Sequence, residues 1–200
     1  MDLQVEPVQT RTAARGFTPC RTVVLVGLMG AGKTKIGRRL ATRLNLPFFD
    51  SDDEIEEAAG ETIAEIFRNR GEAVFREGER RVIARLLCQP VHILATGGGA
   101  FMDPATRAVI RSAGISIWLR ADLEVLLARV ARRSNRPLLS GRDQRAVMED
   151  LIERRHPIYA EADLTVDSGG GAPEATVARV LAALSECPRA LLPPDPESGK

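Results

Sequence analysis

The eight residues from Gly27 to Thr34, GLMGAGKT, constrain this chain more than any other stretch. They match G-x-x-x-x-G-K-[ST] at every fixed position. An apolar, β-branched run over residues 22–26 comes before them, and the helical spacing of Ile36, Leu40 and Leu44 comes after. A strand, a glycine turn and a helix bring free backbone N–H groups and a helix N-terminus together on a phosphate group. The sequence therefore predicts that the chain binds a nucleoside triphosphate.

This phosphate loop, residues 27–34, has an expected role at each position. Glycine leaves room for the backbone to wrap an anion, because it carries no Cβ. Lys33 would reach the β- and γ-phosphates, and the Thr34 hydroxyl would ligate Mg²⁺. A chance glycine turn carrying a lysine is the competing interpretation, and the flanking strand and helix argue against it. The predicted nucleotide-binding residues of the loop are Gly27, Met29, Gly30, Ala31, Gly32, Lys33 and Thr34.

Composition narrows the class of protein. The 200 residues, 44% apolar and 28% charged, suit one globular domain, and a net charge of +1 provides no global field for nucleic acid or membranes. Three widely spaced cysteines without a CxxC argue against a disulfide framework or a zinc site and fit a reducing cytosol. No apolar run approaches the ~20 residues that cross a bilayer, and the first residues resemble no signal peptide. We expect a cytoplasmic protein that binds neither nucleic acid nor membrane.

Strand and helix patterns alternate along the chain, which predicts an α/β fold with a parallel sheet covered on both faces. The predicted strands are residues 22–26, 46–49, 91–95, 115–119 and 164–166. The predicted helices after the loop helix are 62–67 and 72–87, joined at Gly71, then 103–114, 122–129, 143–154, interrupted before Pro157, and 173–184. Residues 1–20 are predicted as a flexible extension, 21–186 as the domain, and 187–200 as a disordered tail.

Three features follow predicted strands, at the sheet edge where α/β proteins bind ligands. They are the phosphate loop, Asp50 and the glycine strip Gly97–Gly99. Asp50 could hold Mg²⁺, and Asp52 could accept a proton from an acceptor hydroxyl. Two helix-capping acids are the alternative. Three glycines directly after a buried strand favour close backbone approach to a ligand over an ordinary turn.

Arginines supply nearly all of the positive charge and need individual interpretation. Arg76 could bind a ligand or form a surface ion pair with Glu72 or Glu79. Residues 132–142, RRSNRPLLSGR, have no periodicity, and we interpret them as a lid that carries Arg136. The pattern alone leaves Arg155 ambiguous.

In combination, these motifs resemble those of the shikimate kinases, in the nucleoside-monophosphate-kinase branch of P-loop proteins. The resemblance runs from about residue 23 to 184. It consists of GLMGAGKT (27–34), FFDSD (48–52), TIAEIFRNRGEAVFREGE (62–79), GGGA (97–100), RPLL (136–139) and RHPIY (155–159). The phosphate loop alone is shared by very many proteins, whereas the combination is specific.

The resemblance implies a three-layer α/β/α P-loop kinase with a five-stranded parallel sheet in the order 2-3-1-4-5. It implies phosphorylation of the 3-hydroxyl of shikimate by ATP with Mg²⁺, in chorismate and aromatic amino-acid biosynthesis. ATP and shikimate would be the small-molecule partners of a monomer.

The resemblance also assigns individual residues. Lys33, Asp52 and Arg136 would be catalytic, and Thr34 and Asp50 would hold the metal. Arg136 would close on the phosphates, and Arg129 would stack on adenine. The acceptor would contact Asp52, Arg76, Gly97, Gly98, Gly99 and Arg155. The two arginines would grip its carboxylate, with Glu79 steadying the first.

One segment departs from the family pattern, and two other functions compete with this one. Ser168-Gly169-Gly170-Gly171 stands where similar enzymes have polar or basic residues near adenine, so the resemblance assigns no adenine contact to this segment. A related small-molecule kinase, such as one for gluconate, is the first alternative, and two arginines suited to a carboxylate together with the FRxGE context of Arg76 argue against it. A non-catalytic nucleotide-binding homologue is the second, and the presence of Asp52 and Arg136 argues against it.

Overall fold

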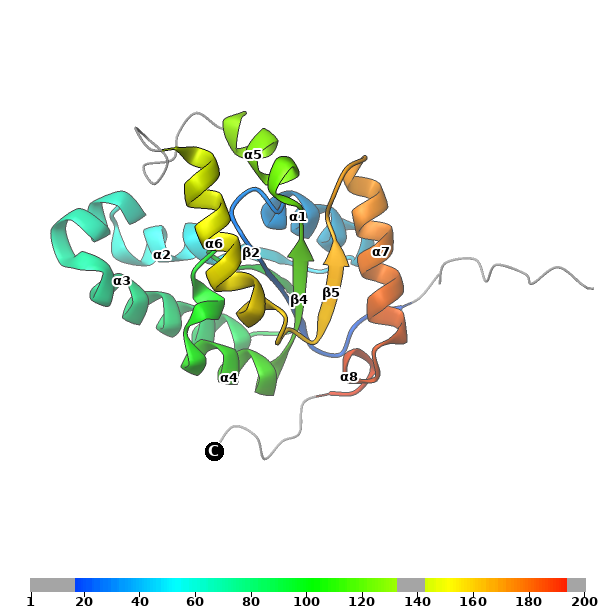
Figure 1. The fold of residues 1–200 in the computed structure, drawn as a ribbon. Helices are drawn as coiled ribbons and strands as arrows, with labels where there is room; N and C mark the ends of the chain where they lie inside the picture. The colour runs from blue at the N-terminus through cyan, green and yellow to red at the C-terminus, as the bar shows by residue number, and fades with distance from the viewer. Residues whose placement is uncertain (1–16, 133–142, 194–200) are drawn as a thin grey trace, which may run out of the picture.

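The computed structural model describes residues 17–132 and 143–193, which form a parallel five-stranded sheet with helices on both sides (Figure 1). The strands are β1 (Thr22–Val26), β2 (Phe48–Asp50), β3 (Ile93–Ala95), β4 (Gly114–Arg120) and β5 (Leu164–Asp167). Their order is β2-β3-β1-β4-β5. The predicted fold and strand order are therefore confirmed.

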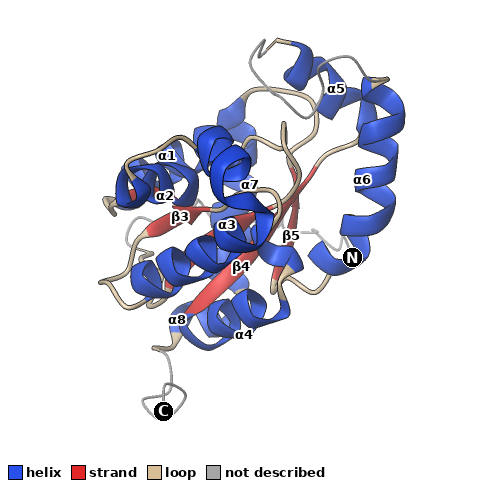
Figure 2. Cartoon of the chain, turned by 90° about the vertical axis from the view of Figure 1, so that its left-hand side faces the viewer, coloured by secondary structure: helices blue, strands red, loops and turns tan. Residues whose placement is uncertain are grey.

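Helices form the outer two layers, and Figure 2 shows the strands enclosed between them. The helices are α1 (Lys33–Leu44), α2 (Ser51–Ala59), α3 (Ile63–Leu87), α4 (Pro104–Ala113), α5 (Leu123–Ala131), α6 (Gln144–Tyr159), α7 (Pro173–Glu186) and α8 (Pro188–Leu191), with a 3₁₀ turn, η1, at Ala100–Met102. Helix α1 packs against α7, and α3 packs against α4. No helix among the described residues is long and apolar enough to cross a membrane.

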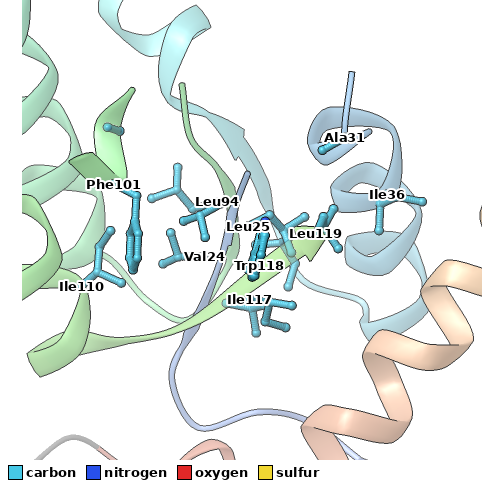
Figure 3. Packing of buried hydrophobic residues seen from close by; sticks show 14 of the residues in the cluster. Val24, Leu25, Ala31, Ile36, Leu94, Phe101, Ile110, Ile117, Trp118 and Leu119 are labelled. Atoms are coloured by element: carbon cyan, nitrogen blue, oxygen red, sulfur yellow. The ribbon is translucent and has the colours of Figure 1, made fainter. Parts of the chain in front are cut away.

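The central strand β1 is buried over its whole length, because helices cover both of its faces. Alternate side chains point to opposite sides of a strand, and Figure 3 shows both sides filled. Val24 lies towards Phe101 and Ile110 on one side, whereas Leu25 lies towards Ile36 of α1 on the other. Apolar burial on both faces fixes the strand end from which the phosphate loop emerges.

The sequence predicted a junction between two helices at Gly71 and an interruption before Pro157. Helix α3 is bent at Gly71, where φ is 82° and ψ is 170°, so the predicted junction is confirmed. The predicted interruption of α6 before Pro157 is wrong, because the helix runs on to Tyr159. The proline lies in the last turn, where the N–H of Ala160 still bonds to the carbonyl of His156 at 2.9 Å. A proline there removes only one helical hydrogen bond.

The predicted disordered tail is also wrong for its described part, residues 187–193. Ala190 of short helix α8 is buried against the domain, and so is Cys187, the residue before the helix. The N–H of Cys20 donates to Ala190 O at 2.8 Å, and Arg21 Nη2 donates to Pro193 O at 2.9 Å. The four-residue helix is too short to give a periodic pattern, so the sequence did not reveal it.

Candidate active site

The phosphate loop connects the end of β1 to the first turn of α1. Gly27, Gly30 and Gly32 all have positive φ, and a Cβ on Gly27 would lie 2.8 Å from the carbonyl oxygen of Leu119. The loop therefore needs glycine at this first position for both conformation and space. Lys33 Nζ donates to Gly27 O at 2.7 Å. The loop thus brings a cation and the N-terminus of α1 to one place, as anion binding requires.

Thr34 and Asp50 meet beside this loop. Thr34 Oγ1 donates to Asp50 Oδ2 at 2.8 Å, which joins the first turn of α1 to the end of β2. Asp50 also caps α2, since its Oδ1 accepts from the N–H of Asp52 at 3.2 Å. Capping and placement beside the loop therefore coexist in one carboxylate.

The glycine strip Gly97–Gly99 follows β3, and each glycine lies against a residue predicted to bind the acceptor. A Cβ on Gly97 would lie 2.7 Å from Asp52 Oδ1, and one on Gly98 would lie 3.7 Å from Arg155 Nη1. On Gly99 it would lie 2.5 Å from Arg76 Nη1. Side chains at the two outer positions would displace Asp52 and Arg76.

Arg76 is held by two carboxylates of its own helix. Its Nη1 donates to Glu79 Oε2 at 2.6 Å, and its Nε donates to Glu72 Oε1 at 3.3 Å. Burial alone would lower the pKa of Arg76, but the hydrogen bonds and charges of Glu79 and Glu72 outweigh it and raise that pKa. These ion pairs fix the guanidinium of Arg76 beside Gly99.

Glu79 is buried, which is unfavourable for a charged carboxylate. Only 2% of the residue is exposed, and desolvation raises the pKa of its carboxyl even though Arg76 opposes the shift. The pKa shifts of the two partners differ because Arg76 keeps 31% of its side chain exposed and Glu79 keeps 3%. Removal of Arg76 would leave the buried charge of Glu79 without its cation and would lower the stability of the fold. Glu79 and Arg76 are therefore needed together.

Three positioning contacts were not predicted from the sequence. Arg155 Nη1 and the Tyr159 hydroxyl both donate to Gly98 O, at 2.9 Å and 2.5 Å. The N–H of Gly97 donates to the buried Ser51 Oγ at 3.0 Å. The four-residue spacing of Arg155 and Tyr159 is a usable signal only if α6 continues past Pro157.

Arg129 connects the phosphate loop to the segment after β5. Its Nη1 donates to Gly30 O at 3.2 Å and its Nη2 donates to Ser168 O at 2.6 Å. Ser168 Oγ donates in turn to Ala31 O at 2.8 Å. Burial lowers the pKa of Arg129, which remains a cation because guanidinium stays protonated in proteins.

A single cavity of about 650 Å³ joins these groups. Its lining includes nearly all of the predicted site residues within the described part of the chain: Met29, Gly30, Ala31, Gly32, Lys33, Thr34, Asp50, Asp52, Arg76, Gly97, Gly98, Gly99, Arg129 and Arg155. Gly27 does not line it. Arg136 and the predicted lid beyond Arg132 lie outside the described residues.

Comparison with known proteins assigns the family. The family model described as shikimate kinase matches residues 29–185. The shikimate kinase of Paramagnetospirillum magneticum is 60% identical over 164 residues, 82% of this chain and 84% of that protein. The chain belongs to the shikimate kinase family.

A second shikimate kinase, from Caulobacter vibrioides, is 54% identical over 166 residues, which cover 83% of each chain. Among solved structures, shikimate kinase from Acinetobacter baumannii in complex with shikimate aligns with a TM-score of 0.77 at 40% identity. The alignment covers 80% of this chain and 90% of that one. A gluconokinase from Sinorhizobium meliloti, at 17% identity and a TM-score of 0.51, shares the fold alone.

Proposed function

We propose that this chain transfers the γ-phosphoryl group of ATP to the 3-hydroxyl of shikimate and forms shikimate 3-phosphate, in the biosynthesis of chorismate and aromatic amino acids. One observation carries the proposal: the same cavity is lined by the phosphate loop at one part and by Arg76 and Arg155 around the glycine strip at another. A nucleotide and an acidic acceptor would therefore meet in one enclosure. Membership of the family supports this assignment.

The nucleotide would lie along the phosphate loop. Lys33, which contacts Gly27 O and Leu28 O in the structure, would bind the β- and γ-phosphates. A positioned cation stabilises the charge that spreads over the transferring group. Arg129 would stack on adenine, and its hydrogen bonds to Gly30 and Ser168 support it at that end of the cavity.

Mg²⁺ fits the pair formed by Thr34 and Asp50. Magnesium prefers oxygen ligands, and the Thr34 hydroxyl and the Asp50 carboxylate already lie 2.8 Å apart beside the loop. These two residues would hold the ion, which neutralises phosphate charge when it is bound with the nucleotide.

Asp52 and the two arginines would handle the acceptor. Arg76 and Arg155 would bind the carboxylate, because a guanidinium offers a planar fork that matches its two oxygens. Asp52 would accept the proton of the 3-hydroxyl as that oxygen bonds to the phosphorus atom and ADP leaves. Close packing of Asp52 against Gly97 supports this role.

Arg136 completes the proposed machinery on the basis of the RPLL motif alone. It would bind the phosphates from the lid, and lid closure would exclude water that could hydrolyse ATP. We also propose that the enzyme works as a cytoplasmic monomer. The odd number and wide spacing of the three cysteines support a reducing compartment.

A coupled ADP-release assay tests the proposal. Wild-type protein should release ADP when ATP, Mg²⁺ and shikimate are present together, and release little without an acceptor. Lys33→Ala should lower kcat by ~100-fold or more. Wild-type turnover in that variant, or ADP release independent of shikimate, would contradict the proposed function.

A further inference from the structure

One carbonyl oxygen in the glycine strip receives two side-chain donors from the same helix. Arg155 and Tyr159 are four residues apart on α6 and therefore share a face. Arg155 Nη1 donates to Gly98 O at 2.9 Å, and the Tyr159 hydroxyl donates to the same oxygen. The pair exists because α6 continues through Pro157.

The Tyr159 side chain is held by contacts of both its ring and its hydroxyl. The residue is fully buried, and its ring stacks on Phe101 and on Trp118 with centroids 6.3 Å and 6.0 Å away. Burial raises the pKa of its phenol to about 12, against the lowering effect of Arg155, so the hydroxyl stays protonated and donates. A rigid ring with a permanent donor can place its acceptor accurately.

The rest of the glycine strip is held by different contacts. The N–H of Gly97 donates to Ser51 Oγ, and the carbonyl oxygens of Gly97 and Gly99 accept from Ala100 and Met102 of the 3₁₀ turn. Gly98 O is the strip oxygen held by side chains, and one of its two donors is Arg155, a proposed acceptor ligand. The position of Arg155 thus depends on where Gly98 O lies.

We propose that Tyr159 is a positioning residue of the acceptor site, whose hydroxyl fixes the Gly98 carbonyl and thereby the guanidinium of Arg155. Arg155 donates to this carbonyl through Nη1. Its guanidinium has further N–H donors that can bind a carboxylate. Without the hydroxyl, Arg155 alone would restrain a flexible glycine. This inference rests on the proposed function, because it assigns a role towards the same acceptor.

Tyr159→Phe tests the role directly, because phenylalanine keeps the ring contacts and removes only the hydroxyl. We expect the KM for shikimate to rise by ~5- to 10-fold, the effect of one well-placed hydrogen bond. The kcat and the KM for ATP should stay within about twofold of wild type, because the nucleotide contacts are untouched.

Ser116→Ala is the matched control for loss of a buried hydroxyl. Ser116 lies on β4, and its Oγ donates to Asp163 Oδ2 at 2.7 Å. It does not line the cavity. This variant should lower the Tm without changing the KM for shikimate. An unchanged shikimate KM in Tyr159→Phe would overturn the positioning role. Equal rises of shikimate KM in both variants would also overturn it, since a general loss of stability would then explain them.

The wild-type protein offers a second readout that needs no substitution. Tyr159 is the only tyrosine of the chain, so tyrosine labelled with ¹³C at Cζ gives one resonance. Addition of shikimate should shift this resonance, and ADP alone should leave it in place. No shift at a shikimate concentration that saturates ADP release would overturn the inference. Absence of shikimate-dependent ADP release would instead contradict the proposed function.

Discussion

The guanidinium of Arg76 occupies the space that a side chain at Gly99 would need. A Cβ on Gly99 would lie 2.5 Å from Arg76 Nη1, a distance that packed atoms do not tolerate. Gly99 has a φ of −102°, which any residue adopts, so the need for glycine here comes from Arg76 and not from the backbone. Arg76, which the family resemblance assigned to the acceptor, therefore packs directly against the glycine strip.

Gly99→Ala should therefore weaken acceptor binding specifically. The methyl group would displace Arg76, and we expect the KM for shikimate to rise by ~10-fold or more while the KM for ATP changes little. Gly78→Ala is the matched control, because a Cβ at that helical position meets nothing within 4 Å. It should keep wild-type kinetics and raise stability slightly. A wild-type shikimate KM in Gly99→Ala would refute this close-contact account.

Arg155→Lys separates charge from geometry. Lysine keeps the positive charge but lacks the planar fork that matches a carboxylate, so the KM for shikimate should rise by ~10-fold or more. Arg154→Lys serves as the control, since the neighbouring side chain is 74% exposed and pairs with Asp150. It should leave both KM values unchanged. A rise in the KM for ATP in Arg155→Lys would place Arg155 on the nucleotide side.

The single tyrosine makes the pH behaviour of Tyr159 measurable by ultraviolet absorbance. Its phenol should titrate with a pKa of about 12 in the folded protein and near the ordinary value of 10.0 after unfolding. Because the folded state keeps the proton longer, the free energy of unfolding should fall as the pH rises from 10.0 towards about 12. Tyrosinate formation at the ordinary pKa in folded protein would show that the phenol is exposed.

Arg189 should stabilise the domain without affecting turnover. It pairs with Asp163, whose side chain is 15% exposed, and it also donates to Arg111 O, so it fastens α8 to the end of the sheet opposite the phosphate loop. We expect Arg189→Ala to lower the free energy of unfolding by about 1–3 kcal/mol with kcat retained. Arg81→Ala removes an exposed pair with Glu77 and should cost less than about 0.5 kcal/mol. Equal denaturation midpoints for the two variants would refute this.

Features encoded by adjacent residues could be predicted from the sequence. The phosphate loop between an apolar strand and a helix is readable from adjacent residues, and the end of β2 at Asp50 follows from the abrupt change to acidic residues. The strand order came from the family resemblance, since composition and spacing alone give only a parallel sheet. These predictions were confirmed by the sheet that the structure shows.

Tertiary contacts explain what the sequence did not reveal. Pro157 looks like a helix end, yet the hydrogen bonds of Arg155 and Tyr159 to Gly98 hold the last turn of α6 in place. Helix α8 is stabilised by Arg21, which lies about 170 positions away, and by the ion pair of its own Arg189 with the distant Asp163. The hydrogen bonds of Arg129 to the phosphate loop likewise join residues about a hundred positions apart.

The most direct test of the whole account is the kcat/KM for shikimate and for gluconate, measured side by side by ADP release with the same enzyme and ATP concentration. Arg76 and Arg155 around the glycine strip suit a rigid acceptor that presents one carboxylate to two fixed guanidinium groups. Both acceptors carry one carboxylate, but gluconate is an open chain that loses more conformational freedom on binding. We therefore predict a preference for shikimate of ~100-fold or more. Equal values, or a preference for gluconate, would contradict the assignment of this cavity to shikimate.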